Sequence, residues 1–185
     1  SPWLNAGSSN PAVSLGWHND GASDYESTRG NNVWAKEDHA GTDLNTGITA
    51  TSSTALPDLD FDYAFNGTQQ PDAGNNLNFA ITQLFYWNNI MHDISYQYGF
   101  DEASGNFQNN NQGRGGAAGD FVFADAQDGS GTDNANFSTG ADGSSPRMQM
   151  YLWTANPYKV LFINSPSALA GGVTSVEGAV SIANL

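Results

Sequence analysis

The chain has 185 residues, and 19 acidic against 5 basic side chains give it a formal net charge of −14 at pH 7. This charge excludes a nucleic-acid binder that works through a basic surface. Only 13% of the residues are charged and 12% are aromatic, which indicates a folded domain rather than a disordered segment. Because the sequence has no cysteine, it has no disulfides, no cysteine-ligated zinc and no thiol nucleophile.

The sequence contains neither an apolar run of membrane-spanning length nor a signal-peptide pattern, so we expect no membrane partner. An acidic, lysine-poor and cysteine-free composition rich in Asn, Gly, Ser and Thr is common in proteins that bacteria export. We therefore expect a secreted, extracellular protein.

The first 76 residues predict irregular loops with short strands, because turn-forming residues are frequent and long apolar runs are rare. The segment 32–36 is one candidate strand. The segment 59–63 alternates apolar and acidic residues with the period of a half-buried strand and is a second candidate.

The most strongly patterned element is a helix over residues 77–98, where apolar residues recur at helical spacing. Asn75 or Asn76 is the expected N-cap, and Gly99 is the expected C-terminal stop. The apolar faces that flank residues 85–87 are wide, which favours contact with more than one neighbouring layer.

The second half of the chain predicts strands separated by turns. Strands are expected at 120–125, 148–153 and 158–164, a short extended segment at 134–137, and turns at 128–131 and 141–143. The predicted fold class is α+β, with a mainly antiparallel, twisted sheet and long loops packed on one long helix. The small-residue tract 168–185 is typical of the start of another domain.

Few residues are arranged for catalysis. His18, His39 and His92 are far apart and form no H-E-x-x-H motif, so the sequence lacks a complete zinc-hydrolase site. We favour a structural role for His92 on the predicted helix. There is no G-x-S-x-G elbow for a serine hydrolase, and the glycine-rich segment 113–119 is expected to be a surface loop rather than a phosphate site.

A set of aspartates gathers around the predicted turns: Asp120, Asp125, Asp128, Asp133 and Asp142. Oxygen-rich loops of this kind can hold Ca²⁺, but the spacing does not match an EF-hand. A solvated acidic face is the interpretation that we favour over a calcium site. The tryptophans in apolar or turn-rich surroundings are expected to anchor the core rather than stack on sugars: Trp17, Trp34 and Trp87.

Several ordered blocks of sequence resemble the fungalysin family of metallopeptidases, and the resemblance covers about residues 11–153. The blocks include W-N-N-I-M-H-D at 87–93, Y-G-F-D-E-A-S-G-N-F-Q at 98–108, A-Q-D-G-S-G-T-D-N-A-N-F at 126–137 and S-P-R-M-Q-M-Y-L-W at 145–153, with upstream segments at 16–21 and 28–35. The resemblance implies a secreted zinc endopeptidase with a catalytic domain similar to thermolysin, in which a mostly β N-terminal subdomain faces a helical C-terminal one across the cleft.

The family's zinc-binding H-E-x-x-H helix and its glutamate ligand follow the matched region, and neither occurs in this sequence. The chain therefore resembles the N-terminal half of the catalytic domain, over residues 1–157. The resemblance assigns no catalytic residue and no zinc ligand to this chain, and we expect the chain alone to be inactive. Residues 158–185 resemble the start of the protease-associated insert of bacterial members, so we expect a bacterial-type protein.

The resemblance also implies a substrate-binding role for four residues. Thermolysin-like enzymes bind the peptide substrate as an added strand along an edge with an Asn-Ala-aromatic segment, and the corresponding residues here are Asn134, Ala135, Asn136 and Phe137. Asn136 stands where that pattern has an aromatic residue. The expected partners are a peptide or protein substrate and the rest of the catalytic domain. A purely structural edge strand, a degenerate family member and a non-catalytic module that binds calcium or glycan remain alternatives.

Overall fold

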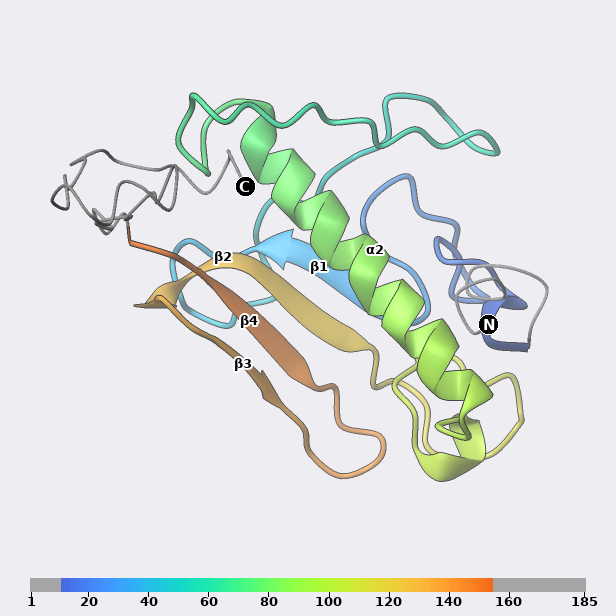
Figure 1. The fold of residues 1–185 in the computed structure, drawn as a ribbon. Coiled ribbons are helices and arrows are strands. Elements are labelled where there is room, and N and C mark those ends of the chain that lie inside the picture. The colour runs from blue at the N-terminus through green and yellow to red at the C-terminus, as the bar shows by residue number, and fades with distance from the viewer. Residues whose placement is uncertain (1–10, 155–185) are drawn as a thin grey trace, which may run out of the picture. The chain divides into compact units, whose positions relative to one another are not determined.

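Long loops connect the helices and strands of residues 11–154, which are the residues that the computed structural model describes. The elements are, in chain order, the 3-10 helix η1 (Pro11–Val13), strand β1 (Val33–Glu37), helix α2 (Asn75–Gln97), the 3-10 helix η2 (Glu102–Ser104), and strands β2 (Val122–Thr132), β3 (Ala135–Ser138) and β4 (Arg147–Leu152). One four-stranded sheet packs against one long helix (Figure 1), so the predicted α+β class is confirmed.

The sheet is mixed rather than mainly antiparallel. Its strand order is β1-β2-β4-β3, and β1 and β4 both lie parallel to β2 while β3 lies antiparallel to β4. The long connection that contains α2 joins β1 to its neighbour β2. Two adjacent parallel strands require a crossover connection of this kind. Strand β3 is consequently left at the edge of the sheet.

Most of the predicted elements are confirmed within a few residues. Helix α2 begins two residues before the predicted start at 77, and the strands expected at 32–36, 134–137 and 148–153 correspond to β1, β3 and β4. The prediction of a turn at 128–131 is wrong, because those residues belong to β2. The register against β4 shifts on both sides of Asp128, and this irregularity lets the strand pass through turn-like sequence.

The strand predicted at 59–63 is also wrong, since these residues form no ladder. Phe61 and Tyr63 nevertheless pack against the core, which accounts for their alternation with exposed acidic residues. The expected Asn caps of α2 are replaced by Gly74, and Asn76 instead donates to the carbonyl oxygens of Asn66 and Gln70 in the preceding loop. The predicted strand 158–164 and the insert expected at 158–185 lie outside the described residues.

The core lies between α2 and the β1-β2 half of the sheet. Its buried members are Val33, Ala35, Ala50, Leu77, Ile81, Phe85, Val122, Ala124 and Ala126. The small alanines on the strands allow the helix to approach the sheet closely, and each large buried side chain contributes about 1.5–3 kcal/mol. Trp17 packs against this core as expected and donates from Nε1 to Asp93 Oδ2 at 3.0 Å, whereas Trp87 is 48% exposed and is not a core anchor.

No helix within residues 11–154 has both the length and the apolar character needed to cross a membrane.

The imidazole of His18 is a titratable group at the border of the core. It stacks on Phe61 with ring centroids 5.0 Å apart and lies 4.7 Å from the ring of Phe85. Burial lowers the pKa of His18 below its usual value of 6.5, although a hydrogen bond with the Ser27 carbonyl oxygen partly opposes the shift. The neutral ring is therefore the form that the fold favours.

We expect His18 to make the protein less stable in mild acid. Because the pKa is lower in the folded state, the stabilisation from neutral His18 is fully present above about pH 6.5 and is lost as the pH falls through the lowered pKa. Urea unfolding between pH 8 and pH 5 should show a steeper fall in the free energy of unfolding for the wild type than for His18→Gln. Equal slopes for the two proteins would contradict this prediction.

Candidate functional site

Strand β3 presents a free strand edge. All four of its residues are exposed, and it pairs with β4 on one side, with Ala135 opposite Met150 and Phe137 opposite Met148. Among the described residues no strand pairs with its other side. Three of the four residues expected to bind a peptide, Ala135, Asn136 and Phe137, therefore lie at this edge, and Asn134 immediately precedes it.

The ladder determines which backbone groups of β3 point outward. Tyr151 N donates to the carbonyl oxygen of Asn134, so residue 134 bonds toward β4. In an antiparallel ladder the direction alternates along the strand, so Asn136 and Ser138 also bond inward. The backbone N–H and C=O groups of Ala135 and Phe137 consequently face away from the sheet, and they are the groups available to an added strand.

Asn136 is held on the face of the sheet rather than at its edge. Its Nδ2 donates to Gln149 Oε1 at 2.9 Å and to Tyr151 Oη at 2.6 Å. The Gln149 Nε2 in turn donates to Asp128 Oδ2 at 2.8 Å and to Asp43 Oδ1 at 3.1 Å. A chain of hydrogen bonds therefore links the edge strand to a group of carboxylates.

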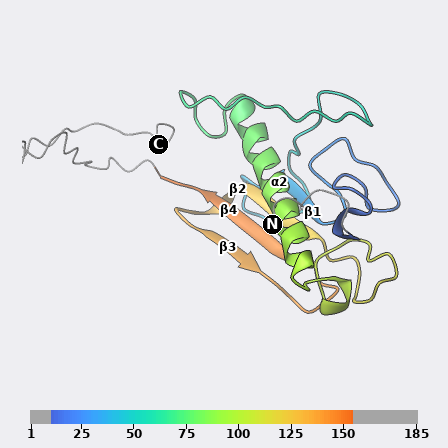
Figure 2. The same ribbon diagram turned by 45° about the vertical axis from the view of Figure 1, so that its right-hand side comes forward.

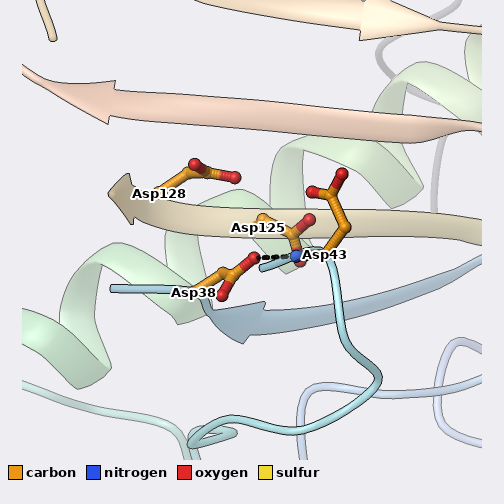
Figure 3. Close-up of side chains that lie close together, drawn as sticks. All are labelled: Asp38, Asp43, Asp125 and Asp128. Carbon is orange, nitrogen blue, oxygen red and sulfur yellow. Dashed lines mark hydrogen bonds between the residues drawn. The ribbon is translucent and has the colours of Figure 1, made fainter. Parts of the chain in front are cut away.

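That group consists of Asp38, Asp43, Asp125 and Asp128, which offer oxygen atoms within 4.8 Å of one another (Figure 3). Asp38 follows β1, Asp125 and Asp128 belong to β2, and Asp43 lies in the loop after Asp38. Three of the four are buried, and only Asp43 is exposed. We call these residues the aspartate cluster.

Protein donors already satisfy the carboxylates of the aspartate cluster. Asp125 accepts from Lys36 Nζ at 2.6 Å and from Arg147. Asp38 accepts from the backbone N–H groups of Thr42 and Asp43, and Asp128 Oδ1 accepts from Ser130. Because these donors and two cations fill the positions that a metal ion would take, the cluster does not support the alternative of a calcium site.

The predicted solvated acidic face is wrong for the buried members of the set. Asp120, Asp125 and Asp128 are at most 1% exposed. Asp120 accepts from the backbone N–H groups of Gln108 and Gly143 and so joins two loops. Asp133 and Asp142, by contrast, are exposed as expected.

The histidines lie apart and do not form a zinc site within residues 11–154. His18 lies at the border of the core, His39 contacts Gln127 Oε1 at 2.8 Å, and His92 lies on α2 beside Asp93 at 3.1 Å. His92 Nε2 also contacts Gln108 Oε1 at 3.4 Å, which fits the structural role expected for it. The described residues therefore do not fit a catalytic zinc ion, and we assign none of them as a ligand.

The glycine-rich segment 113–119 forms a surface loop, as predicted. Arg114 Nη1 donates to Glu102 Oε1 at 2.8 Å, and Asn111 Nδ2 donates to the carbonyl oxygens of Gly115 and Ala117. These contacts attach the loop to η2 and leave it with a structural role.

The sequence analysis did not identify three residues that lie at this group of carboxylates: Lys36, Asp38 and Asp43. Lys36 is fully buried and its partner Asp125 is 89 residues away. A strand sequence of the form V-W-A-K-E gives no signal that its lysine is buried, since lysine is normally exposed. Only the parallel pairing of β1 with β2 brings the two charges together.

The free edge of β3 can accept an added strand, and the surrounding sequence resembles that of peptidases. Together these features indicate a candidate peptide-binding part of a hydrolase. The comparison with known families is specific. The sequence profile of the fungalysin metallopeptidase (M36) family matches residues 3–168, and the chain belongs to this family.

Several fungal proteins are similar to the chain. Extracellular metalloproteinase 2 of Trichophyton tonsurans is 46% identical over 153 residues, which are 83% of this chain and 23% of the relative. Extracellular metalloproteinase 2 of Arthroderma otae is 45% identical over 158 residues, covering 85% and 24% of the two proteins. Extracellular metalloproteinase 3 of T. tonsurans is 43% identical over 171 residues, covering 91% and 25%.

The chain thus spans about a quarter of the length of these relatives. The relatives are fungal, so the expectation of a bacterial-type member is not supported. The expectation of a metallopeptidase sequence is confirmed at the level of the family.

The buried Lys36 and Asp125 generate a prediction about stability. Both side chains are 0% exposed. Lys36→Met removes one cation and leaves Asp125 buried with only Arg147, so we expect the free energy of unfolding to fall by about 3–5 kcal/mol in urea titrations. Arg147→Met is the matched control and should cost less, because that side chain is 16% exposed and bordered by solvent. A loss below ~1 kcal/mol for Lys36→Met would contradict the prediction.

Proposed function

We propose that this chain forms the substrate-binding wall of the catalytic cleft of a secreted zinc metalloendopeptidase. The observation that carries the proposal is the free edge of β3, where the backbone groups of Ala135 and Phe137 point outward. Membership of the fungalysin family supports a metallopeptidase, and the names of the relatives support secretion. Zinc and its ligands would belong to a part of the protein outside this chain.

The proposed substrate is an extended peptide that binds as a fifth strand next to β3. Its main chain would exchange hydrogen bonds with Ala135 and Phe137, which provides affinity largely independent of the peptide sequence. Two adjacent strands lie about 4.8 Å apart, so the peptide backbone would follow the edge closely. Asn136 would not reach the peptide directly, because its amide is bound to Gln149 and Tyr151.

The proposed partner is the rest of the catalytic domain. The described histidines lie apart, and the aspartate cluster is satisfied by Lys36, Arg147, Gln149 and backbone donors. A zinc ion and a general base must therefore come from elsewhere if peptide bonds are to be cleaved. This division assigns binding to the present chain and the chemical step to its partner.

We expect the purified chain of 185 residues to be inactive as a peptidase. Incubation with fluorescein-labelled casein in the presence of zinc should release no more fluorescence than buffer does. Release that a chelator abolishes would show that the chain holds a complete zinc site and would overturn the proposed division of roles.

The edge should bind peptides even without the catalytic step. We expect amide resonances of Ala135 and Phe137 to shift most when an extended, basic hexapeptide is titrated into the ¹⁵N-labelled chain, because a basic peptide is attracted to a chain of net charge −14. The inward amides of Asn136 and Ser138 are internal controls. A hexapeptide N-methylated at alternate residues on its pairing edge is the matched ligand control and should cause smaller shifts. Equal shifts with both peptides would exclude strand addition at β3.

A further inference from the structure

The sequence contains a single Asn-Gly step, at Asn66 and Gly67. The step lies in the loop that leads into α2, at the N-terminal end of the helix (Figure 2). Residues 64–72 of this loop are all exposed. Glycine has no side chain to shield its backbone nitrogen, so the side-chain amide of Asn66 is adjacent to the least hindered backbone nucleophile that a protein offers.

A turn holds the Asn66 side chain and polarises its amide carbonyl. Asn66 Oδ1 accepts from the backbone N–H of Thr68 at 3.0 Å and from Thr68 Oγ1 at 2.7 Å. Two donors on one carbonyl oxygen stabilise the negative charge that develops there when a nucleophile adds to the carbon. The turn therefore activates Cγ of Asn66 toward the neighbouring nitrogen of Gly67.

The main chain of Asn66 anchors the loop to the helix. Asn76, in the first turn of α2, is only 2% exposed. Its Oδ1 accepts from the Asn66 N–H at 2.8 Å, and its Nδ2 donates to the Asn66 carbonyl oxygen at 2.9 Å. The N–H of Gln69 donates to the same carbonyl oxygen at 3.1 Å. A chemical change in the main chain of residue 66 would thus alter the contacts of the first turn of a helix that packs on the core.

We propose that the turn at Asn66 is a site of spontaneous deamidation, and that isoaspartate formed there detaches the loop from the start of α2. The inference is independent of the proposed peptidase function, because it uses only residues of this chain. Water is the only co-reactant.

The reaction proceeds through a succinimide ring. The backbone nitrogen of Gly67 loses its proton to solvent base and attacks Cγ of Asn66. A bond forms between this nitrogen and Cγ, and the bond from Cγ to Nδ2 breaks as ammonia leaves with a proton from solvent. Water then opens the ring. Cleavage of the new bond gives aspartate, whereas cleavage of the bond to the backbone carbonyl carbon gives isoaspartate, whose main chain runs through Cγ.

The two products have different effects on the anchor. The aspartate product keeps the original main chain and with it both bonds to Asn76. In the isoaspartate product, the carbonyl group that accepted from Asn76 and Gln69 becomes a free carboxylate, and the main chain gains a methylene group. Because Asn76 is buried, the loss of its partners weakens the first turn of α2. Both products add negative charge to a chain of net charge −14.

The first experiment measures where the chain deamidates. The 185-residue chain is produced in a bacterial host, because residues 66–68 are also an acceptor sequence for N-glycosylation. It is kept in mildly alkaline buffer, and peptide mapping by mass spectrometry gives the rate at each asparagine. We expect the fastest rate within residues 11–154 at Asn66. Asn45, which is also exposed but precedes Thr46, is the internal control and should stay intact. A faster rate at another asparagine of this range would overturn the proposal.

Variants of the turn test the chemistry. Gly67→Ala shields the attacking nitrogen and should slow deamidation of Asn66. Thr68→Val removes the hydroxyl donor to Asn66 Oδ1 and should slow it about three- to tenfold, the effect of one hydrogen bond. Thr68→Ser keeps a hydroxyl and should restore the wild-type rate. A wild-type rate in Gly67→Ala or in Thr68→Val would overturn the proposal.

Hydrogen–deuterium exchange on the aged chain tests the release of the helix. Protein isoaspartyl methyltransferase measures the isoaspartate fraction in the same sample. We expect peptides from the first turn of α2 to show a second population that exchanges about tenfold faster, in an amount equal to the isoaspartate fraction. Freshly prepared Asn66→Asp is the matched control, because it has the added charge without the altered main chain, and it should show only the slow population. A single slow population in a sample that contains isoaspartate would overturn the proposal.

Discussion

The buried carboxylate of Asp125 joins the three parallel strands of the sheet. It lies on β2 and binds Lys36 from β1 and Arg147 from β4. Asp125 pairs with Lys36 in the β1 ladder, so the ion pair and the backbone register specify the same alignment. A shift of β1 by one residue against β2 would place Lys36 and Asp125 on opposite faces of the sheet and leave the Lys36 ammonium without its carboxylate. The arrangement of the edge depends on this register, because β4 in turn positions β3.

The sheet has two faces of different chemistry. On the side of α2 the strands present alanines, valines and methionines, and on the other side they present Lys36, Asp125, Arg147 and Gln149. The polar face holds the strands in register, and the apolar face provides the core. Because side chains alternate along a strand, both faces follow from single strand sequences such as R-M-Q-M-Y-L in β4.

Local patterns could predict the elements but not the contacts between distant strands. Helix α2 has apolar residues at helical spacing over most of its length, and Gly99 ends it with φ of 96°. The segment 59–63 shows that alternation alone is insufficient, since half-buried residues in a loop can produce the same pattern. The aspartate cluster needed the three-dimensional fold, because it combines two residues of β2 with two from the segment that follows β1. The edge position of β3 also depends on strand order, which the sequence pattern does not specify.

The alternation along β3 links the direction of each backbone group to the face of the sheet that its side chain occupies. In a strand, residues that direct their backbone groups to one edge also direct their side chains to one face. Phe137 therefore offers its N–H and C=O to the free edge while its ring lies on the apolar face of the sheet, beside Met148. The contact between these two side chains holds β3 against β4 without using the outward backbone groups, so the free edge and the apolar face are separate surfaces of the same four residues.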